Sequence, residues 1–194
     1  SMAACAADTS SNSSGDSSSE AGEVLIGSVG PLTGNLAAYG TSVKNAIAMA
    51  VDEINADGGV LGGKTLKVVE YLDDKGDSTE GANALNKLIS EDVSAVIGSV
   101  TSGVTAGLAE IADENDMLLL TPTATNDDIT TGKSTVFRAC FADSYQGEIV
   151  AKFMKESLGV TKVGVLYASG DAYSAGLYNS FKAAAADLGL ELVA

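Results

Sequence analysis

Small hydroxyl side chains lie in the segments that directly follow the buried apolar runs of the chain. Ser102 comes after the run SAVIGSV, and Thr123 and Thr125 come after MLLLT. Tyr39 and Tyr173 are the aromatic residues of two comparable segments, GPLTGNLAAYG and ASGDAY. A serine at the start of a helix adds its hydroxyl to unpaired backbone N–H groups and the positive end of the helix dipole. Such an arrangement suits the binding of a carboxylate.

The same residues have structural explanations that the sequence leaves open. Ser102 is equally expected as a simple N-cap. The segment 121–125 is equally typical of a turn containing Pro122, whose hydroxyls bind local backbone groups. Asp171, in the segment before Tyr173, is expected to serve a turn.

The residue types that catalysis needs are scarce. Histidine is absent, which excludes Ser-His and Cys-His nucleophile pairs and the commonest metal ligand. The segment GPLTGNLAAYG fits neither G-x-G-x-x-G nor the Walker lysine pattern. The acidic pairs Asp73–Asp74 and Asp127–Asp128 are expected to be solvated strand ends, not a metal site or a catalytic dyad. We therefore expect no enzyme activity, no metal and no cofactor.

The composition describes an ordered protein with a strongly acidic surface. The chain has 194 residues, is 45% hydrophobic, and carries a net charge of -15. Nucleic acid is not expected as a partner, because binding it requires a basic surface. No segment is long and apolar enough to cross a bilayer, which takes about 20 residues.

Apolar runs and helical periodicities alternate from residue 23 onward. Strands are expected at residues 24–29, 65–71, 94–100, 117–121, 135–139, 162–167 and 190–193, and helices around 43–54, 77–89, 104–112, 149–158 and 177–188. Near-continuous apolar strands that alternate with amphipathic helices predict a doubly wound parallel sheet covered on both faces. The fold class is therefore α/β.

The elements group into one complete α/β lobe and part of a second. Residues 1–21 read as a Ser-rich flexible tether, 22–141 as an N-terminal lobe, and 142–194 as the beginning of a second lobe. The last strand would leave a sheet edge without a neighbour. Either the chain is a fragment, or another chain covers this edge, for instance in a dimer.

The two cysteines have different surroundings. Cys140 is expected to pack as a small buried hydrophobe. Cys5 follows small residues and precedes a tract, 10–19, in which seven of ten residues are serine. This pattern resembles the processing site of a bacterial lipoprotein, where the cysteine carries the lipid. The alternative is a free thiol near an engineered terminus that begins with a cloning remnant, Ser1.

Three motifs taken in order resemble a known family. They are IGSVGPLTGNLAAYG, AVDEINADGGVLGGKTLKVVEYLDD and VIGSVTSGVTAGLAEIADENDMLLLTPTAT. They resemble the amino-acid-binding proteins of bacterial ABC importers, with the type I periplasmic binding fold, and most of all the leucine/isoleucine/valine branch. The resemblance implies two α/β lobes joined by a hinge, with a ligand enclosed between them, and no catalysis.

The resemblance also implies roles for single residues. Ser102 would bind the ligand α-carboxylate, and Thr123 would act through its backbone at the α-amino and carboxylate groups. The Thr125 hydroxyl would meet the α-ammonium. Tyr39 would form a wall of the side-chain pocket, and Tyr173 would close over the ligand from the second lobe. Residues 143–147 resemble the segment that enters the second lobe past the hinge.

Two departures from the family pattern affect these expectations. Gly76 and Thr101 stand where some branched-chain binders have a disulfide pair, and Thr101 lies near the side-chain pocket. The acidic residue that pairs with the ligand ammonium in this family should lie beyond Ala194. Because a buried ammonium without a counter-charge is costly, we expect this chain to bind amino acids weakly or not at all.

The functional expectation is a lipid-anchored, extracytoplasmic or periplasmic receptor that delivers a branched-chain or other apolar amino acid to a membrane permease. One alternative is a receptor for amides, urea or a related small polar solute on the same fold. A second, from another class, is a flavodoxin-like enzyme or signalling domain, which would need a phosphate-binding loop or a buried acidic cluster.

Overall fold

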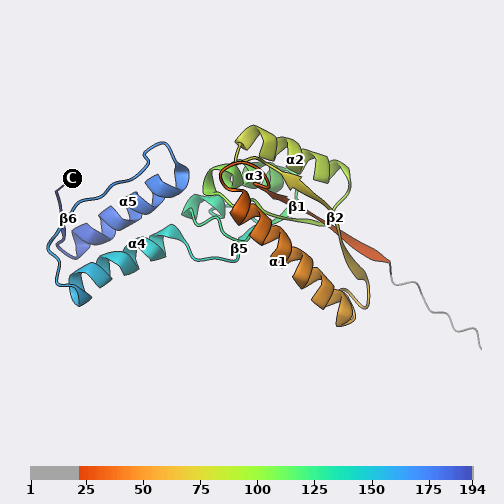
Figure 1. Ribbon diagram of the computed structural model, residues 1–194, viewed down its shortest axis with the longest axis horizontal. Helices are drawn as coiled ribbons and strands as arrows, with labels where there is room; N and C mark the ends of the chain where they lie inside the picture. Colours follow the sequence, from red (N-terminus) through yellow and green to blue (C-terminus); the bar gives the residue numbers. More distant parts are fainter. Residues whose placement is uncertain (1–21, 194) are drawn as a thin grey trace, which may run out of the picture.

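The computed structural model describes residues 22–193, so the expectations for the tether, for Cys5 and for Ala194 lie outside the described residues. The chain alternates strands and helices, with a doubly wound first part (Figure 1). Its strands are β1 Glu23–Gly30, β2 Thr65–Asp73, β3 Ala95–Ile97, β4 Leu118–Thr121, β5 Val136–Arg138, β6 Lys162–Val163 and β7 Glu191–Leu192. Its α-helices are α1 Ala37–Ala56, α2 Ser78–Ser90, α3 Ser102–Glu114, α4 Asp143–Lys152 and α5 Ala172–Asp187.

Five parallel strands form the main sheet, in the order β2-β1-β3-β4-β5. Its register pairs Gly27 with Val96, Val96 with Leu119, and Leu119 with Val136. From β1 the chain first adds β2 on one side of β1 and then adds β3, β4 and β5 on the other side. The switch point of the sheet therefore lies between β1 and β3. In open α/β sheets, ligands bind beyond the carboxyl ends of the strands at such a point.

Helices α2 and α3 cover one face of the sheet with a continuous apolar core. The inward side chains of the strands include Val29, Val96 and Leu119, all fully buried. Leu85 and Leu88 of α2 and Leu108 of α3 pack against them and are fully buried as well. This face fits the expected pattern.

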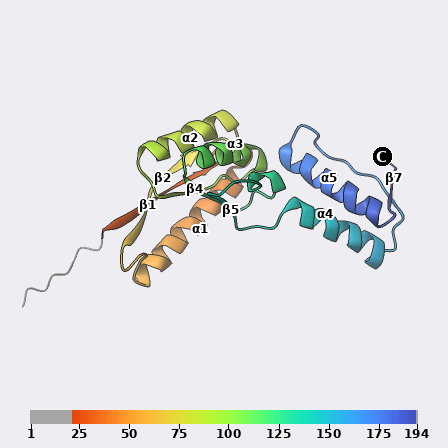
Figure 2. The ribbon, with the colours of Figure 1, turned by 180° about the vertical axis from the view of Figure 1, so that it is seen from behind.

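Coverage of the opposite face differs from the expectation. Helix α1 lies on that face and contacts β1 and β2 (Figures 1 and 2). Over β4 and β5, however, Leu118, Leu120 and Phe137 remain 44%, 36% and 51% exposed. Within the described residues, one helix covers β1 and β2 but does not reach this part of the sheet, so the prediction of a sheet covered on both faces was wrong there.

Residues 143–192 form a smaller unit with its own apolar cluster. Helices α4 and α5 lie side by side in both ribbon views, and β6 and β7 pair in parallel beside them. The buried residues of this cluster are Ala151, Phe181, Ala185 and Leu190. The strand predicted at residues 162–167 is only two residues long, because β6 has β7 as its single neighbour and the chain from Gly164 onward joins no ladder.

Two further expectations about side chains in this region were wrong. Helix α4 ends at Lys152 and continues as a π-helical turn, Phe153–Ser157, and the side chains of Ile149, Phe153 and Leu158 are exposed instead of facing a core. Cys140 is half-buried, not fully buried. Burial nevertheless raises the pKa of its thiol, with nearby Arg138 acting in the opposite direction.

Gly147 permits the close approach of α4 and α5. A Cβ atom at this position would lie 2.6 Å from Phe181 N and 2.7 Å from Ser180 C, both backbone atoms. We expect Gly147→Ala to push the helices apart and lower the free energy of unfolding by about 1–3 kcal/mol. The matched control is Gly107→Ala in α3, where a Cβ would meet nothing within 4 Å.

Urea denaturation of the two variants measures the difference. Gly107→Ala should raise stability by up to about 1 kcal/mol, because alanine favours the helix. Equal midpoints for Gly147→Ala and the unaltered protein would contradict the packing described for α4 and α5.

Candidate ligand-binding site

The predicted site residues belong to segments that follow the carboxyl ends of strands. The loop after β1 leads to Tyr39 in the first turn of α1, and the loop after β3 leads to Ser102, the first residue of α3. The segment after β4 carries Thr123 and Thr125, and Tyr173 lies in the first turn of α5. Since β1 and β3 flank the switch point, the fold places Tyr39 and Ser102 on either side of it.

Ser102 is buried, with 3% of its surface exposed, at the amino end of α3. The N-cap is Thr101, which makes no side-chain capping hydrogen bond, so the interpretation of Ser102 as an N-cap was wrong by one residue. Ser102 Oγ accepts a long hydrogen bond of 3.4 Å from Asn126 N. A helix start without a side-chain cap, next to a buried hydroxyl, can accept an anion such as a carboxylate.

Threonine hydroxyls of the segment after β4 form hydrogen bonds with the segment after β3. Thr121 Oγ1 donates to Ser99 O at 2.8 Å, and Thr123 Oγ1 donates to Val100 O at 2.7 Å. Thr121 Oγ1 also accepts from Ala124 N at 3.1 Å, so the expected bond to local backbone is confirmed for Thr121. That expectation was wrong for Thr123, whose carbonyl partner lies 23 residues away in the chain, and for Thr125, which is only 7% exposed and whose Oγ1 makes no hydrogen bond. Thr125 thus keeps a hydroxyl available for a further partner.

Asp74 lies beneath this network and is fully buried, so the prediction of a solvated strand end was wrong. Its carboxylate accepts hydrogen bonds from the Ser99 hydroxyl and, at 2.8 Å, from Gly76 N. Desolvation raises the pKa of the Asp74 carboxyl, although both hydrogen bonds lower it. Asp74 therefore fixes the start of the segment that leads to Ser102. Asp73, by contrast, is partly exposed and accepts from Leu32 N at 2.7 Å.

Removing the Asp74 carboxylate should destabilise the protein. In Asp74→Ala the buried Ser99 hydroxyl and Gly76 N–H lose their acceptor, which costs about 1–3 kcal/mol of unfolding free energy. The exposed Asp57, at the end of α1, is the control, and its replacement by alanine should change stability by no more than about 0.5 kcal/mol. Chemical denaturation that gave both variants the same midpoint would contradict the buried role of Asp74.

Asp143 is the residue that sequence reasoning missed. It is the first residue of α4, it is 1% exposed, and its backbone N donates to Thr125 O at 2.8 Å. Neither carboxylate oxygen has a hydrogen-bond partner among the described residues. The local sequence only places Asp143 in an expected hinge segment. Nothing in that sequence predicts that its carboxylate is buried.

The acidic pair Asp127–Asp128 lies in a short 3-10 helix, Asp127–Ile129, so the expectation of a strand end was wrong, although Asp128 is exposed. Asp127 accepts from Ser144 N at 2.9 Å and from Ser144 Oγ, which joins the segment after β4 to the start of α4. Asp171 is the N-cap of α5 and accepts from Ser174 N at 2.8 Å, as the expected turn role implies. Asn126 Nδ2 donates to Ala172 O at 3.1 Å, so this segment also touches the start of α5.

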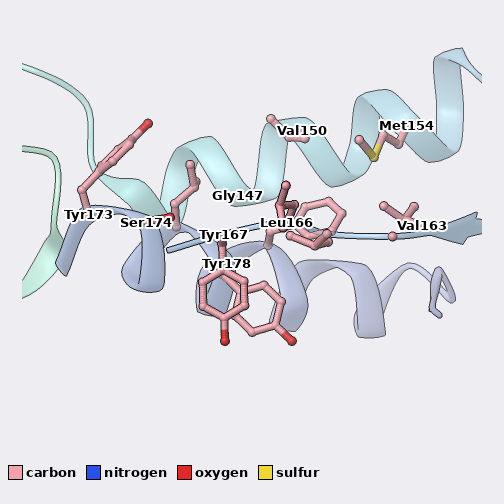
Figure 3. Close-up of a pocket in the computed structure, with 13 residues that line it drawn as sticks. Gly147, Val150, Met154, Val163, Leu166, Tyr167, Tyr173, Ser174 and Tyr178 are labelled. Carbon is pink, nitrogen blue, oxygen red and sulfur yellow. The ribbon is translucent and has the colours of Figure 1, made fainter. Parts of the chain in front are cut away.

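The two predicted aromatic residues have exposed rings. Tyr39 is 64% exposed and Tyr173 is 40% exposed. Tyr173 also borders an apolar cavity of about 350 Å³ between α4, α5 and residues 163–167. Figure 3 shows Tyr173 at one end of this cavity, apart from Tyr167 and Tyr178, whose rings stack at 4.1 Å. The cavity offers few polar groups, so it does not resemble a site for a zwitterion.

Two negative findings complete the description of residues 22–193. No group of three or more His, Cys, Asp or Glu side chains in this part of the chain is arranged to hold a metal ion. None of its helices combines the length and the apolar character that a membrane crossing would need.

The fold is that of a doubly wound α/β protein, and its candidate site is formed by side-chain hydroxyls and backbone groups. The polar groups lie at the switch point of a parallel sheet, next to the junction with a second α/β unit, and they offer hydrogen bonds without an acid–base pair. The family model described as "Periplasmic binding protein" matches residues 23–194. The chain belongs to this family.

Relatives and solved structures agree with that assignment. The Leu/Ile/Val-binding protein BraC3 of Rhizobium johnstonii is 42% identical over 162 residues, which are 83% of this chain and 43% of BraC3. The leucine-binding protein LivK of Thermotoga maritima matches with a TM-score of 0.81 and 36% identity, over 88% of this chain and 47% of LivK.

A third match contains a bound amino acid. LivJ of Streptococcus pneumoniae, described as a branched-chain amino acid transporter substrate-binding protein in complex with isoleucine, matches with a TM-score of 0.77 and 37% identity. The match covers 84% of this chain and 46% of LivJ. The chain thus spans less than half the length of these relatives.

Proposed function

We propose that this protein captures an apolar, branched-chain amino acid for an ABC importer and delivers it to the membrane permease. The observation that carries the proposal is the pairing of Ser102, at a helix start without a side-chain cap, with Thr125, whose buried hydroxyl has no partner. Asn126 links the two, because its N–H contacts Ser102 Oγ and it follows Thr125 in the chain. The names of BraC3, LivK and LivJ support the same ligand class.

In this proposal each residue has one role toward the ligand. Ser102 and the first amides of α3 bind the α-carboxylate, and the Thr125 hydroxyl accepts from the α-ammonium. Thr123 contributes its backbone, since its own hydroxyl is used by Val100 O. Tyr39 and Tyr173 supply exposed rings that can close over an apolar side chain.

We propose the domain arrangement on the same basis. A first lobe of residues 22–141 and a second lobe beginning at residue 142 would close on the ligand by a hinge motion. The separate apolar clusters of the two parts and the short contacts of Asn126 and Asp127 across the junction support this division. Residues 1–21 would form a tether lipidated at Cys5 and hold the receptor at the outer face of the membrane.

Calorimetric titration of the full native chain tests the proposed function. Leucine, isoleucine and valine should each bind, and two leucine analogues should bind more weakly: 4-methylpentanoate, which lacks the ammonium, and 3-methylbutylamine, which lacks the carboxylate. NMR titration into the millimolar range would detect a weak complex. Binding of urea or an amide, with no response to any amino acid, would overturn the assignment of the ligand.

A further inference from the structure

Unsatisfied buried polar atoms concentrate at one place in the described residues. Four buried side-chain oxygens of residues 22–193 lack a hydrogen-bond partner: Thr105 Oγ1, Thr125 Oγ1 and the two carboxylate oxygens of Asp143. Three of these four belong to Thr125 and Asp143, whose backbones are joined by a 2.8 Å hydrogen bond. Native proteins satisfy nearly all buried polar groups, so such a concentration calls for an explanation.

The groups around Asp143 leave its charge without a direct partner. Arg138 is near enough to lower the pKa of the carboxyl, but its Nη1 donates to Asn126 O at 2.8 Å. Asp127 and Asp171 add negative charge, and each accepts from a serine N–H, of Ser144 and Ser174. The net result is that desolvation raises the pKa of Asp143, and the nearby Thr125 hydroxyl opposes this increase.

The local backbone keeps space around the carboxylate. Gly176 of α5 faces it, and a Cβ atom there would lie 3.3 Å from Asp143 Oδ2 and 2.8 Å from Asn126 Nδ2. A glycine at this position thus allows α5 to approach the segment of Thr125 and Asn126 without displacing the acid. A buried carboxylate with no hydrogen bonds lowers stability, and a neutral side chain would avoid that cost.

We propose that Asp143 is a positioning residue for the ligand ammonium, acting through Thr125. The Thr125 O–H turns toward the carboxylate, so that the oxygen lone pairs face the ligand and accept from its ammonium. The negative charge of Asp143 lies behind that hydroxyl, while the positive end of α3 lies at Ser102. The two ends of the site therefore match the two charges of an amino-acid zwitterion. This inference rests on the proposed function.

A double-mutant cycle on leucine affinity tests the coupling between the two residues. Asp143→Asn and Thr125→Val should each weaken leucine binding about tenfold or more, as expected for a hydrogen bond to a charged group. The double variant should bind no more weakly than the poorer single variant, because each change breaks the same interaction. Thr105→Val, which removes the other unpartnered buried hydroxyl, is the control and should leave affinity unchanged.

The response to 4-methylpentanoate separates positioning from a general structural role. This ligand lacks the ammonium, so Asp143→Asn should leave its affinity unchanged within about twofold. Losses that are additive in the cycle, an unchanged leucine affinity in Asp143→Asn, or equal losses for both ligands would each overturn the inference. Those results would leave the proposed function intact, whereas a complete absence of leucine binding by the full native chain without any substitution would overturn both.

Discussion

Ser102→Ala is expected to weaken leucine binding by about tenfold to a hundredfold. The variant removes a buried hydroxyl from the start of α3, where Thr101 supplies no side-chain cap. A hydrogen bond to a charged group contributes about 1.5–3 kcal/mol, and the lost affinity follows from that range. The first backbone amides of α3 remain, which is why some affinity for the carboxylate should persist. Calorimetric titration with leucine measures the loss.

Ser90→Ala is the matched control for this experiment. Ser90 is exposed at the end of α2, and its hydroxyl donates to Lys87 O at 2.6 Å. Ser90→Ala therefore removes the same chemical group as Ser102→Ala, but at the other end of a helix that carries none of the proposed ligand-binding residues. It should leave leucine affinity unchanged. If Ser102→Ala bound leucine as tightly as the control, the carboxylate would have to bind elsewhere.

Asp143→Asn is expected to change stability in the direction opposite to its effect on binding. The unaltered protein buries the Asp143 carboxyl group, and desolvation raises its pKa and so disfavours the charged form. Replacing it by a neutral amide should raise the free energy of unfolding by about 1 kcal/mol or more. For a chain of this size, that corresponds to an increase in Tm of about 2–4 °C. A gain in stability joined to a loss of affinity is typical of a functional residue.

The difference in stability between Asp143→Asn and the unaltered protein should depend on pH. The direction of the pKa shift of Asp143 decides how. Desolvation raises the pKa of folded Asp143 above its unfolded value, so between the two values the folded state holds the extra proton. The stability of the unaltered protein should therefore rise as pH falls toward the folded pKa, and the advantage of Asp143→Asn should shrink. Asp127, Arg138, Asp171 and Cys140 act on Asp143 electrostatically and are present in both proteins.

Thermal unfolding of Asp143→Asn and of the unaltered protein, measured in parallel from pH 8 to pH 4, gives the difference in their stabilities directly. Asp74 also has a raised pKa and changes stability in the same direction, but it cancels in the comparison. An advantage of Asp143→Asn that grew as pH fell would contradict the uncompensated buried charge.

The order and type of the elements could be predicted from sequence because each is a strong local pattern. The run from Val24 to Val29 lies in β1, and the periodic residues around Leu85 and Leu88 lie on the inward face of α2. The prediction of a strand over residues 162–167 was wrong for most of its length. An apolar run becomes a strand only where another strand is available to pair with it. Local patterns do not contain that information.

The site was predictable in part for the same reason. The segments that carry Ser102, Thr123 and Thr125 were recognisable because they follow apolar runs and resemble family motifs. Asp74 was misjudged because its partner Ser99 lies 25 residues away in the chain, and only the pairing of β1 with its two neighbours brings them together. Asp143 carried no local signal, because its burial depends on α5 and on the segment after β4.

A crystal structure of the full native chain with leucine tests the central claim most directly. We predict the leucine carboxylate within hydrogen-bonding distance of Ser102 Oγ and the first amides of α3, and the ammonium at Thr125 Oγ1 with Asp143 behind it. Leucine bound in the apolar cavity between α4 and α5, or with its ammonium turned toward the start of α3, would contradict this account.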